Sequence, residues 1–488
     1  MKLLKILLFF AIAATLKSAV AQGELQSAVK NLHQSTEFQH AGISFLAINA
    51  ETGEKIVEQN PLLGLPPAST AKLFSTAAAI EILGPDYRPK TRIYIDGSVS
   101  PDSVLHGNIW IRGGGDMTLG SRFFTQQGHE KDFLKSWVDS ITSAGIKQIN
   151  GKIIADGSEF GYAGVPDGWS WVDIGNYYGA GPSGICLFDN TIRYNFKTGA
   201  TAGSPTTLIN YFPEIPGLTF HNYIQSANVN DDNSYIYGGP FSNDRFGTGS
   251  LPLNRTNYSV KGSMPDPEYQ LAYEFEKALK NAGIVVNEGS EGARSLTNHS
   301  IINYSKTFKL LFTHRGQKLI DIAKLTNMKS INLFAEGLVC LIGYEKTGNG
   351  STESGIKEIE KYWSTRINTR GLILKDGSGL SRSNGISASH FCELLKYMNT
   401  SKFKDAFNST LPVAGKSGTL NSLCRNQAGQ GRVSAKSGTM SKIKSYSGYV
   451  QSTSGKKIAF AIILTNFSGS SSNATTKIES ILNQLANF

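Results

Sequence analysis

The chain has 488 residues, of which 40% are hydrophobic and 18% are charged. This composition excludes an intrinsically disordered protein, and the length exceeds what one hydrophobic core usually serves, so we expect two or three domains. The formal net charge of +10 is compatible with neighbouring anionic envelope polymers, with a membrane surface, or simply with a solvated basic surface. It does not indicate a nucleic-acid partner, because no basic stripe is interleaved with aromatic residues.

The N-terminus predicts a targeting segment. Two lysines precede an apolar run from Ile6 to Ala14, and small residues at positions 19–21 are typical of a cleavage site. The apolar run is too short to span a bilayer as an ordinary helix. We therefore expect residues 1–21 to be a signal peptide and the mature chain, beginning near Gln22, to act outside the cytoplasm.

The cysteine content argues against a disulfide scaffold and against a metal site. Four cysteines in a chain of this length are too few for such a scaffold, so free buried thiols are favoured, although export permits a bridge. None has the spacing of metal ligands, and no HExxH sequence is present, which argues against a zinc hydrolase. We expect neither a metal nor a cofactor. The cysteines are Cys186, Cys340, Cys392 and Cys424.

The first predicted elements are two strands and a helix. Two apolar stretches form the strands in GISFLAINAETGEKIVEQN, joined by a turn at residues 51–53. A helix is predicted in PPASTAKLFSTAAAIEILGP, because prolines precede it, alanines favour it, and Gly84-Pro85 ends it.

Residues from about Ile95 to about Ser300 have a different sequence pattern. Short strands with glycine-rich turns are expected first, and the stretch from Phe196 to about Pro267 is typical of small all-β structure. A helix follows in PEYQLAYEFEKALKNAG, with three apolar residues on one face. They are Leu271, Phe275 and Leu279.

Helices return after about Ser305. Two helices are predicted to meet near Ser330, and a strand, a turn and a strongly apolar strand follow in KSYSGYVQSTSGKKIAFAIILTNF. The last helix has an apolar stripe, for which packing on a sheet is favoured over a membrane surface. The stripe comprises Ile478, Ile481, Leu482 and Leu485. One α/β domain assembled from both ends of the chain, and interrupted by a long β-rich insertion, is the simplest interpretation.

The first chemical motif is Ser69-x-x-Lys72. On a helix these two side chains share a face, so the amine can reach the hydroxyl that it must deprotonate. The helix start also offers N–H groups to an oxyanion. The pattern alone is weak, but Ser69 differs from the other matches by its position after Pro-Pro and before an apolar helix. Five of those matches begin at Ser27, Ser354, Ser401, Ser441 and Ser454.

The second motif is Ser330-x-Asn332, at the head of a predicted helix. Ser and Asn are frequent helix N-caps, and taken alone the pair favours a cap. The same pair could hold a hydroxyl for proton relay and an amide for a substrate.

The third motif, Lys-Ser-Gly-Thr, occurs twice. The copy at Lys436 leads into two clear strands, which places it on a strand at a sheet edge, and Gly438 would let a ligand approach the backbone. The copy at Lys416 runs into a polar loop with no adjoining strand. Context therefore favours Lys436 as the functional lysine and Lys416 as a loop residue.

The three motifs occur in the order described for penicillin-interacting serine enzymes. Together with IRGGGDMTL, NMKSINLFAE, DGSGLSR and LPVAGKSGTL they make the mature chain resemble the class C low-molecular-mass penicillin-binding proteins, the D-alanyl-D-alanine carboxypeptidase/endopeptidases of the penicillin-binding protein 4 type. In that family the phrase beginning Leu-Pro-x-Ala-Gly is a neighbouring loop that need not contain lysine.

The resemblance implies an α/β serine peptidase core, similar to that of β-lactamases, with an antiparallel sheet, helices and a large β-rich insertion. We expect this core at residues 22–94 plus 301–488. The inserted domain would occupy residues 95–300, with a third, small β domain nested at about 190–262. A periplasmic location is implied as well.

The resemblance also implies roles for individual residues. Ser69 would be the nucleophile, Lys72 its general base, and Ser330 the proton relay to the leaving amine. Asn332 would bind the substrate backbone, and Lys436 would supply positive potential. Ser437 and Thr439, around Gly438, would bind the carboxylate. Asp156 and Arg382 would bind the side chain of the stem peptide. For Asp156 a plain turn residue is an equal alternative.

The implied activity is cleavage of D-Ala-D-Ala or cross-link bonds in peptidoglycan stem peptides, with β-lactams as acylating ligands. Three alternatives stay open: a β-lactamase on this core, an esterase on this core, and an inactive envelope protein that binds peptidoglycan. Peripheral contact with the membrane or the cell wall is compatible with the charge, and the sequence does not fix an oligomeric state.

Overall fold

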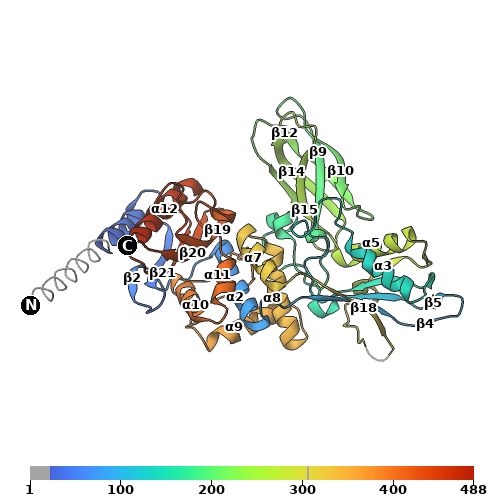
Figure 1. Ribbon diagram of the computed structural model, residues 1–488. Helices are drawn as coiled ribbons and strands as arrows, with labels where there is room; N and C mark the ends of the chain where they lie inside the picture. Colours follow the sequence, from blue (N-terminus) through green and yellow to red (C-terminus); the bar gives the residue numbers. More distant parts are fainter. Residues whose placement is uncertain (1–21, 305–306) are drawn as a thin grey trace, which may run out of the picture. The chain divides into compact units, whose positions relative to one another are not determined.

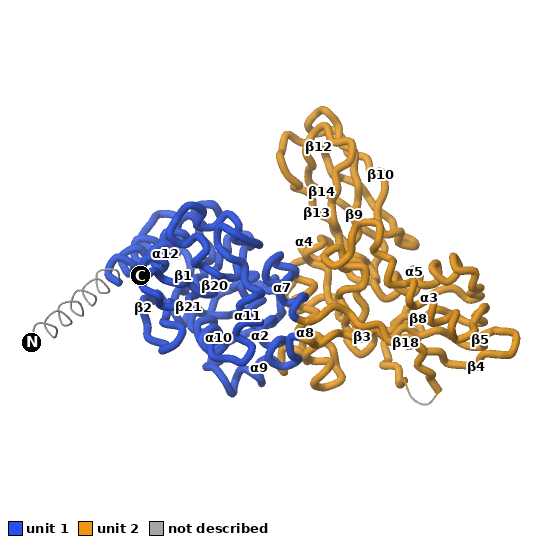
Figure 2. Tube along the Cα trace, in the orientation of Figure 1, with its two compact units in different colours: residues 1–85, 320–331, 359–488 blue, residues 86–319, 332–358 orange. Residues whose placement is uncertain are grey.

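The computed structural model describes residues 22–304 and 307–488. The predicted signal peptide, residues 1–21, lies outside the described residues. Two compact units divide the chain (Figure 2). Among the described residues, the first unit comprises residues 22–85, 320–331 and 359–488, and the second comprises residues 86–304, 307–319 and 332–358.

The first unit is built on a five-stranded antiparallel sheet of order β19-β20-β21-β1-β2. Both ends of the chain supply strands, because β1 pairs with β21 over its whole length. The predicted hairpins are confirmed in β1–β2 and β20–β21. The strands are β1 Gly42–Asn49, β2 Lys55–Gln59, β19 Val433–Met440, β20 Ile443–Gln451 and β21 Lys457–Thr465.

Helices cover both faces of this sheet (Figure 1). On one face, the apolar stripe of α12 (Ser471–Asn487) is buried with helical residues 22–34 against alternate residues of β21. Packing of this stripe on the sheet is therefore confirmed. On the other face, Tyr449 donates to the carbonyl of Leu395 in α10 (Ala388–Thr400), 2.6 Å away. The further helices of the unit are α2 Lys72–Leu83, α7 Leu319–Lys329 and α11 Lys404–Ser409, with residues of α9 Thr352–Ser364.

The helix predicted after Pro66-Pro67 begins differently from the expectation. Residues Ala68–Ala71 form a 3-10 turn (η1), and the α-helix α2 starts only at Lys72. Ala68 has a φ of 49°, which tightens the entry into this turn. Ser69 therefore lies on a tight turn at the start of a helix whose first two turns are almost wholly buried.

The second unit contains four β-sheets among its described residues. Two of them have the orders β17-β8-β6-β3-β18 and β16-β7-β5-β4, and each contains both parallel and antiparallel pairs. Their strands are β3 Lys90–Ile95, β4 Ser98–Val99, β5 Val104–His106, β6 Ile109–Arg112, β7 Gln148–Asn150, β8 Ile153–Asp156, β16 Val285–Val286, β17 Ser290–Gly292 and β18 Lys309–Arg315.

The other two sheets occupy residues 191–263, the region predicted to be small all-β matter. One has the order β10-β9-β15, and in the other β11, β12 and β13 all pair with β14. The strands are β9 Thr191–Lys197, β10 Thr207–Phe212, β11 Thr219–Asn222, β12 Gln225–Ala227, β13 Asn233–Tyr237, β14 Asp244–Pro252 and β15 Tyr258–Ser263.

The boundaries of the second unit differ from the expected 95 and 300. β18 pairs along the whole of β3, so residues on both sides of the expected boundaries join the insertion. The whole of helix α8 (Asn332–Thr347) also belongs to this unit: a Cβ on Gly337 would come within 2.5 Å of Met117 Cε, which shows how closely α8 packs there. Strands far apart in sequence pair with each other and so determine these boundaries, which the local sequence pattern does not predict.

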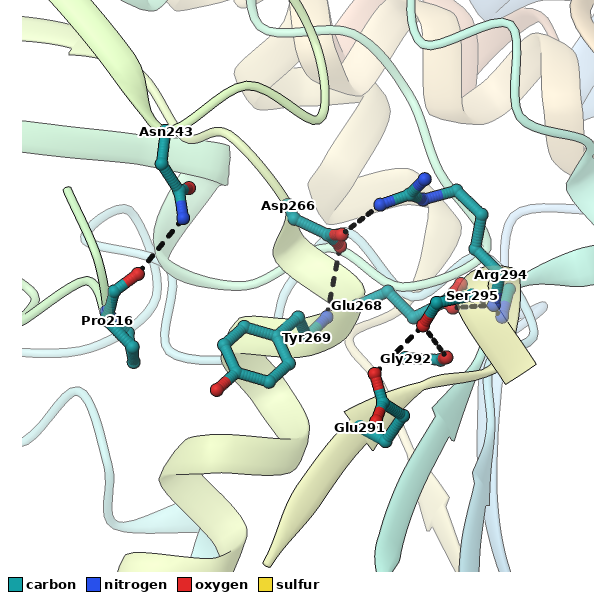
Figure 3. A network of polar contacts seen from close by, with 10 residues as sticks. Pro216, Asn243, Asp266, Glu268, Tyr269, Glu291, Gly292, Arg294 and Ser295 are labelled. Carbon is teal, nitrogen blue, oxygen red and sulfur yellow. Dashed lines mark hydrogen bonds and ion pairs between the residues drawn. The ribbon is translucent and has the colours of Figure 1, made fainter. Parts of the chain in front are cut away.

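The core of the second unit includes two helices, α3 (Phe133–Ser143) and α5 (Pro267–Asn281). The predicted apolar face of α5 is fully buried in this core. Asp266 caps α5 by accepting from the amide of Tyr269, and it also pairs with Arg294 at 3.1 Å (Figure 3). Glu268 lies in the first turn, and its carboxylate accepts backbone amides of Gly157 and Arg294.

Glu268 is expected to make stability depend on pH. Burial raises its pKa to about 8, from 4.5 in the unfolded chain. Between these values the native state binds the extra proton, so the free energy of unfolding should fall as pH rises, by up to about 1.4 kcal/mol per pH unit. The contribution is complete below pH 4.5 and is lost as pH passes 8.

Glu268→Gln should flatten this dependence between pH 5 and pH 9 in urea unfolding, while lowering stability overall because one backbone amide loses its acceptor. Glu276→Gln, which removes an ion pair with Lys280 on the same helix, is the matched control. Parallel pH profiles for wild type and Glu268→Gln would contradict the prediction.

The four cysteines are free and buried, as predicted. Within the described ranges, no helix combines the length and the apolar character needed to cross a membrane. No group of three or more His, Cys, Asp or Glu suited to a metal ion occurs among those residues.

Candidate active site

Ser69 and Lys72 are brought together in the first unit. Lys72 Nζ donates to Ser69 Oγ at 2.9 Å and to the carbonyl of Ser378 at 2.8 Å. The lysine side chain is 0% exposed. The amine is therefore held at one position beside the hydroxyl, where a neutral form could accept the hydroxyl proton.

The loop DGSGLSR, residues 376–382, forms the wall behind this pair. Besides the Ser378 carbonyl, the Gly377 carbonyl accepts from Ser75 on α2 at 2.9 Å. Gly379 has a φ of 81°, and a Cβ there would lie 1.9 Å from the Ala68 carbonyl, so only glycine fits. The sequence pointed to this loop only through the family resemblance, and Ser378 was not predicted as a site residue.

Lys436 and Ser330 form a second pair. Lys436 Nζ donates to Ser330 Oγ at 3.0 Å and to the Ser437 carbonyl at 2.6 Å. Burial, and then repulsion by the Lys72 ammonium, hold the pKa of Lys436 well below its ordinary range. Ser330 itself has a φ of 59° and sits between α7 and α8, so the turn between two helices presents its hydroxyl to the lysine.

Gly438 marks the closest approach of β19 to the nucleophile turn. A Cβ on this residue would lie 2.9 Å from the Ser69 amide nitrogen and 2.7 Å from the Pro67 carbonyl. The sequence predicted that Gly438 would let a ligand approach the backbone. In the structure, the protein's own backbone at Pro67 and Ser69 passes close to this glycine. β19 is an edge strand of the sheet, as predicted for Lys436, and an edge strand can pair with an extended peptide.

Hydroxyl groups line the face of β19 opposite to the one that carries Lys436 and Gly438. Ser437 Oγ donates to Thr419 Oγ1 at 2.8 Å, and Thr439 Oγ1 accepts from Lys444 Nζ at 3.0 Å. Ser437 and Thr439 are two residues apart on one strand, so their side chains share a face. Thr419 and Lys444 were not predicted: no local pattern signals either contact.

The first Lys-Ser-Gly-Thr copy lies in turns and a 3-10 helix (η5, Gly418–Leu420) and has no strand of its own, as expected. Val413 forms a bridge with Ser434 of β19, and this pairing brings the copy beside the second one. Lys416 is exposed, and its end lies over Gly431. The duplicated phrase thus supplies a hydroxyl to the site through Thr419, whereas its lysine points elsewhere.

Three further predicted residues, Arg382, Asn332 and Asp156, make contacts of their own. Arg382 is exposed in the first unit and donates to the Ser441 carbonyl at 3.3 Å. Asn332 begins α8 in the second unit, where its amide donates to the Tyr178 carbonyl at 2.8 Å.

Asp156 also lies in the second unit, and it is 2% exposed. Its two carboxylate oxygens accept from the Ser158 amide and the Tyr304 hydroxyl. This geometry favours the turn-residue alternative that the sequence left open, because the carboxylate is buried and already engaged.

The cluster in the first unit has the parts needed for acyl transfer. It offers a hydroxyl with an adjacent amine, a second hydroxyl with its own amine, and backbone amides where β19 meets the nucleophile turn. These parts come from four separate segments of the chain, near residues 69, 330, 378 and 436.

Comparisons with known proteins agree with this chemistry. The chain matches the model of the D-Ala-D-Ala carboxypeptidase 3 (S13) family over residues 25–487. It is 27% identical over 462 residues to the D-alanyl-D-alanine carboxypeptidase of Actinomadura sp. (strain R39), covering 91% of this chain and 82% of the relative. It is 23% identical over 458 residues to the D-alanyl-D-alanine carboxypeptidase DacB of Haemophilus influenzae, covering 90% of this chain and 88% of the relative.

Solved structures show the same fold. The crystal structure of penicillin-binding protein 4 from Haemophilus influenzae matches 94% of this chain and 99% of its own, with a TM-score of 0.77 and 22% identity. A crystal structure of that protein complexed with a β-lactam matches 95% of this chain and 98% of its own, with a TM-score of 0.71 and 19% identity. The α/β peptidase fold with inserted β-sheets, expected from the sequence, is confirmed.

Proposed function

The chain belongs to the D-Ala-D-Ala carboxypeptidase 3 (S13) family and is a serine-type D-Ala-D-Ala carboxypeptidase, and we propose that Ser69 is the residue that its substrate acylates. The observation that carries this assignment is the 2.9 Å contact between Lys72 Nζ and Ser69 Oγ, made by a lysine without solvent exposure. An amine so placed can take the hydroxyl proton as the oxygen attacks the penultimate D-Ala carbonyl.

The second pair completes the acylation step. Ser330 Oγ passes a proton to the leaving D-Ala amine, and Lys436, which donates to that oxygen, keeps it oriented and supplies positive potential. Asn332 binds the substrate peptide backbone, a role carried over from its motif. The substrate lies as an additional strand along the edge of β19 beyond Ala435, since residues 433–435 of that edge pair with residues 412–414.

The backbone amides of Ser69 and Thr439 form the oxyanion hole. The close approach of Gly438 to the Ser69 amide supports this assignment, because it brings β19 beside the nucleophile. The hydroxyls of Ser437 and Thr439 bind the terminal carboxylate. Water then hydrolyses the acyl-enzyme and releases the shortened peptide.

Three finer assignments accompany this mechanism. Endopeptidase cleavage of cross-links uses the same site, with the amine of a neighbouring stem peptide as the leaving group. Arg382, exposed beside the β19–β20 hairpin, binds the side-chain end of the stem peptide. The enzyme acts in the periplasm after removal of residues 1–21.

β-Lactams acylate the same serine in this proposal. The Haemophilus influenzae protein with the same fold has been crystallised in complex with a β-lactam. A lactam carbonyl would enter the oxyanion hole as the peptide carbonyl does, and its carboxylate would meet the same two hydroxyls.

The proposal is tested by treating the purified protein with penicillin and with an acylated tripeptide ending in D-Ala-D-Ala. We expect an intact-mass increase of one penicillin, mapped to the peptide that contains Ser69, and release of D-Ala from the tripeptide. Fast penicillin turnover without D-Ala release would favour a β-lactamase. No adduct and no release would favour an inactive binding protein.

A further inference from the structure

Lys444 lies directly beside the hydroxyls proposed to bind the substrate carboxylate. It is the first residue after Ile443 on β20, and in the antiparallel register it is paired with Thr439 of β19. Its Nζ donates to Thr439 Oγ1 at 3.0 Å. Side chains of directly opposed residues lie on one face of a sheet, so this contact follows from the register and from the length of lysine.

The electrostatic situation of Lys444 is that of a cation lacking its anion. The side chain is partly buried, and burial lowers the pKa of its ammonium. Within residues 22–304 and 307–488, no aspartate or glutamate forms an ion pair with it. Keeping a partly buried ammonium without a carboxylate partner costs free energy, which a bound anion would recover.

The hydrogen bond also fixes the direction in which Thr439 can donate. An ammonium has three donors and no acceptor, so Thr439 Oγ1 must accept from Lys444. The hydroxyl hydrogen of Thr439 is then left to point at another acceptor. A substrate carboxylate at this position would receive that hydrogen and the attraction of the ammonium behind it.

We propose that Lys444 is a specificity-determining positioning residue that makes the enzyme select substrates with a free carboxylate next to the scissile bond. It acts through Thr439, by orienting the hydroxyl, and through its charge. This inference rests on the proposed function, in which Ser437 and Thr439 hold the terminal carboxylate.

Lys442 provides a matched control on the same hairpin. It is two residues away in sequence, but its Nζ donates to the carbonyls of Ser468 and Gly469, each at 3.1 Å. It therefore carries the same charge close by in sequence while making no contact with Thr439. Loss of overall positive charge and loss of the specific contact can be separated by comparing the two positions.

The test compares kcat/KM for a tripeptide ending in D-Ala-D-Ala with kcat/KM for its C-terminal amide. Lys444→Met should lower kcat/KM for the free acid about 10- to 100-fold, the worth of a charge-assisted hydrogen bond, mainly through KM. The amide, which offers no negative charge, should change no more than about twofold. Lys444→Arg should restore most of the preference, and Lys442→Met should leave it unchanged.

Equal losses for acid and amide in Lys444→Met, or no loss for either, would overturn the inference. A misfolded Lys444→Met is recognised by thermal denaturation, and the ratio of acid to amide in Lys444→Arg then decides: a ratio near that of wild type supports the inference, and a ratio near one refutes it. Failure of the underlying function is a different result, because wild type would then release no D-Ala from either peptide.

Discussion

Ser69→Ala is expected to leave a folded protein that forms no penicillin adduct and has lost activity toward D-Ala-D-Ala peptides by at least about 10⁴-fold. Without the hydroxyl no acyl-enzyme forms, and the remaining groups can only polarise the carbonyl for direct attack by water. The substitution removes one atom from a tight turn whose backbone contacts are made by other residues, such as the Pro67 carbonyl with Thr70 and Ser445. Stability should therefore change little.

The measurement is intact mass after penicillin treatment, together with D-Ala release at matched enzyme concentration. Ser27→Ala is the matched control, because Ser27 also begins a Ser-x-x-Lys sequence but lies exposed on helical residues 22–34 and donates to the Gly23 carbonyl. It should behave as wild type. An adduct that persists in Ser69→Ala would refute the assignment of the nucleophile.

The comparison of these two serines also shows what the sequence could predict. Ser69 and Ser27 share a spacing, and the setting after Pro-Pro and before an apolar helix distinguished them. The spacing predicts the Ser69–Lys72 contact, since it is made within one turn of chain. What it did not predict is the 3-10 geometry of residues 68–71, which depends on contacts with residues far away in sequence.

Contacts between segments far apart in the sequence could not be predicted from local patterns. The edge position of β19 followed from the strands after it, and two helices were expected to meet at Ser330. The partner of Lys72 at Ser378, by contrast, lies 306 positions away, and no periodicity reports such a pairing. The pairing of β18 with β3, which places residues on both sides of the expected boundaries in one unit, is likewise a contact between distant segments.

Asp156 illustrates a residue type that sequence alone leaves ambiguous. A carboxylate after a strand can bind a ligand or close a turn, and both uses favour the same residue. Only the positions of Ser158 and Tyr304 show that both of its oxygens are already engaged. Thr419 is the converse case, since a hydroxyl in an apparently redundant phrase contacts Ser437.

The duplicated Lys-Ser-Gly-Thr phrase leads to the second large expected effect. Lys436→Ala should lower kcat/KM for D-Ala-D-Ala peptides, and the rate of acylation by penicillin, about 10²- to 10³-fold, the usual cost of removing an electrostatic donor from an active site. Ser330 would lose the buried amine that donates to its hydroxyl oxygen. Lys416→Ala should change both rates no more than about twofold, since its side chain is exposed and lies over Gly431.

The two substitutions delete the same atoms from the same local sequence, so their difference isolates the effect of position in the fold. Each variant should be compared with wild type by acylation rate and by thermal denaturation, because Lys436 is buried and Lys416 is not. A loss of acylation in Lys436→Ala at an unchanged melting temperature identifies a role at the site. Comparable losses in both variants would refute the choice of Lys436, and would mean that the first copy acts through more than its Thr419 hydroxyl.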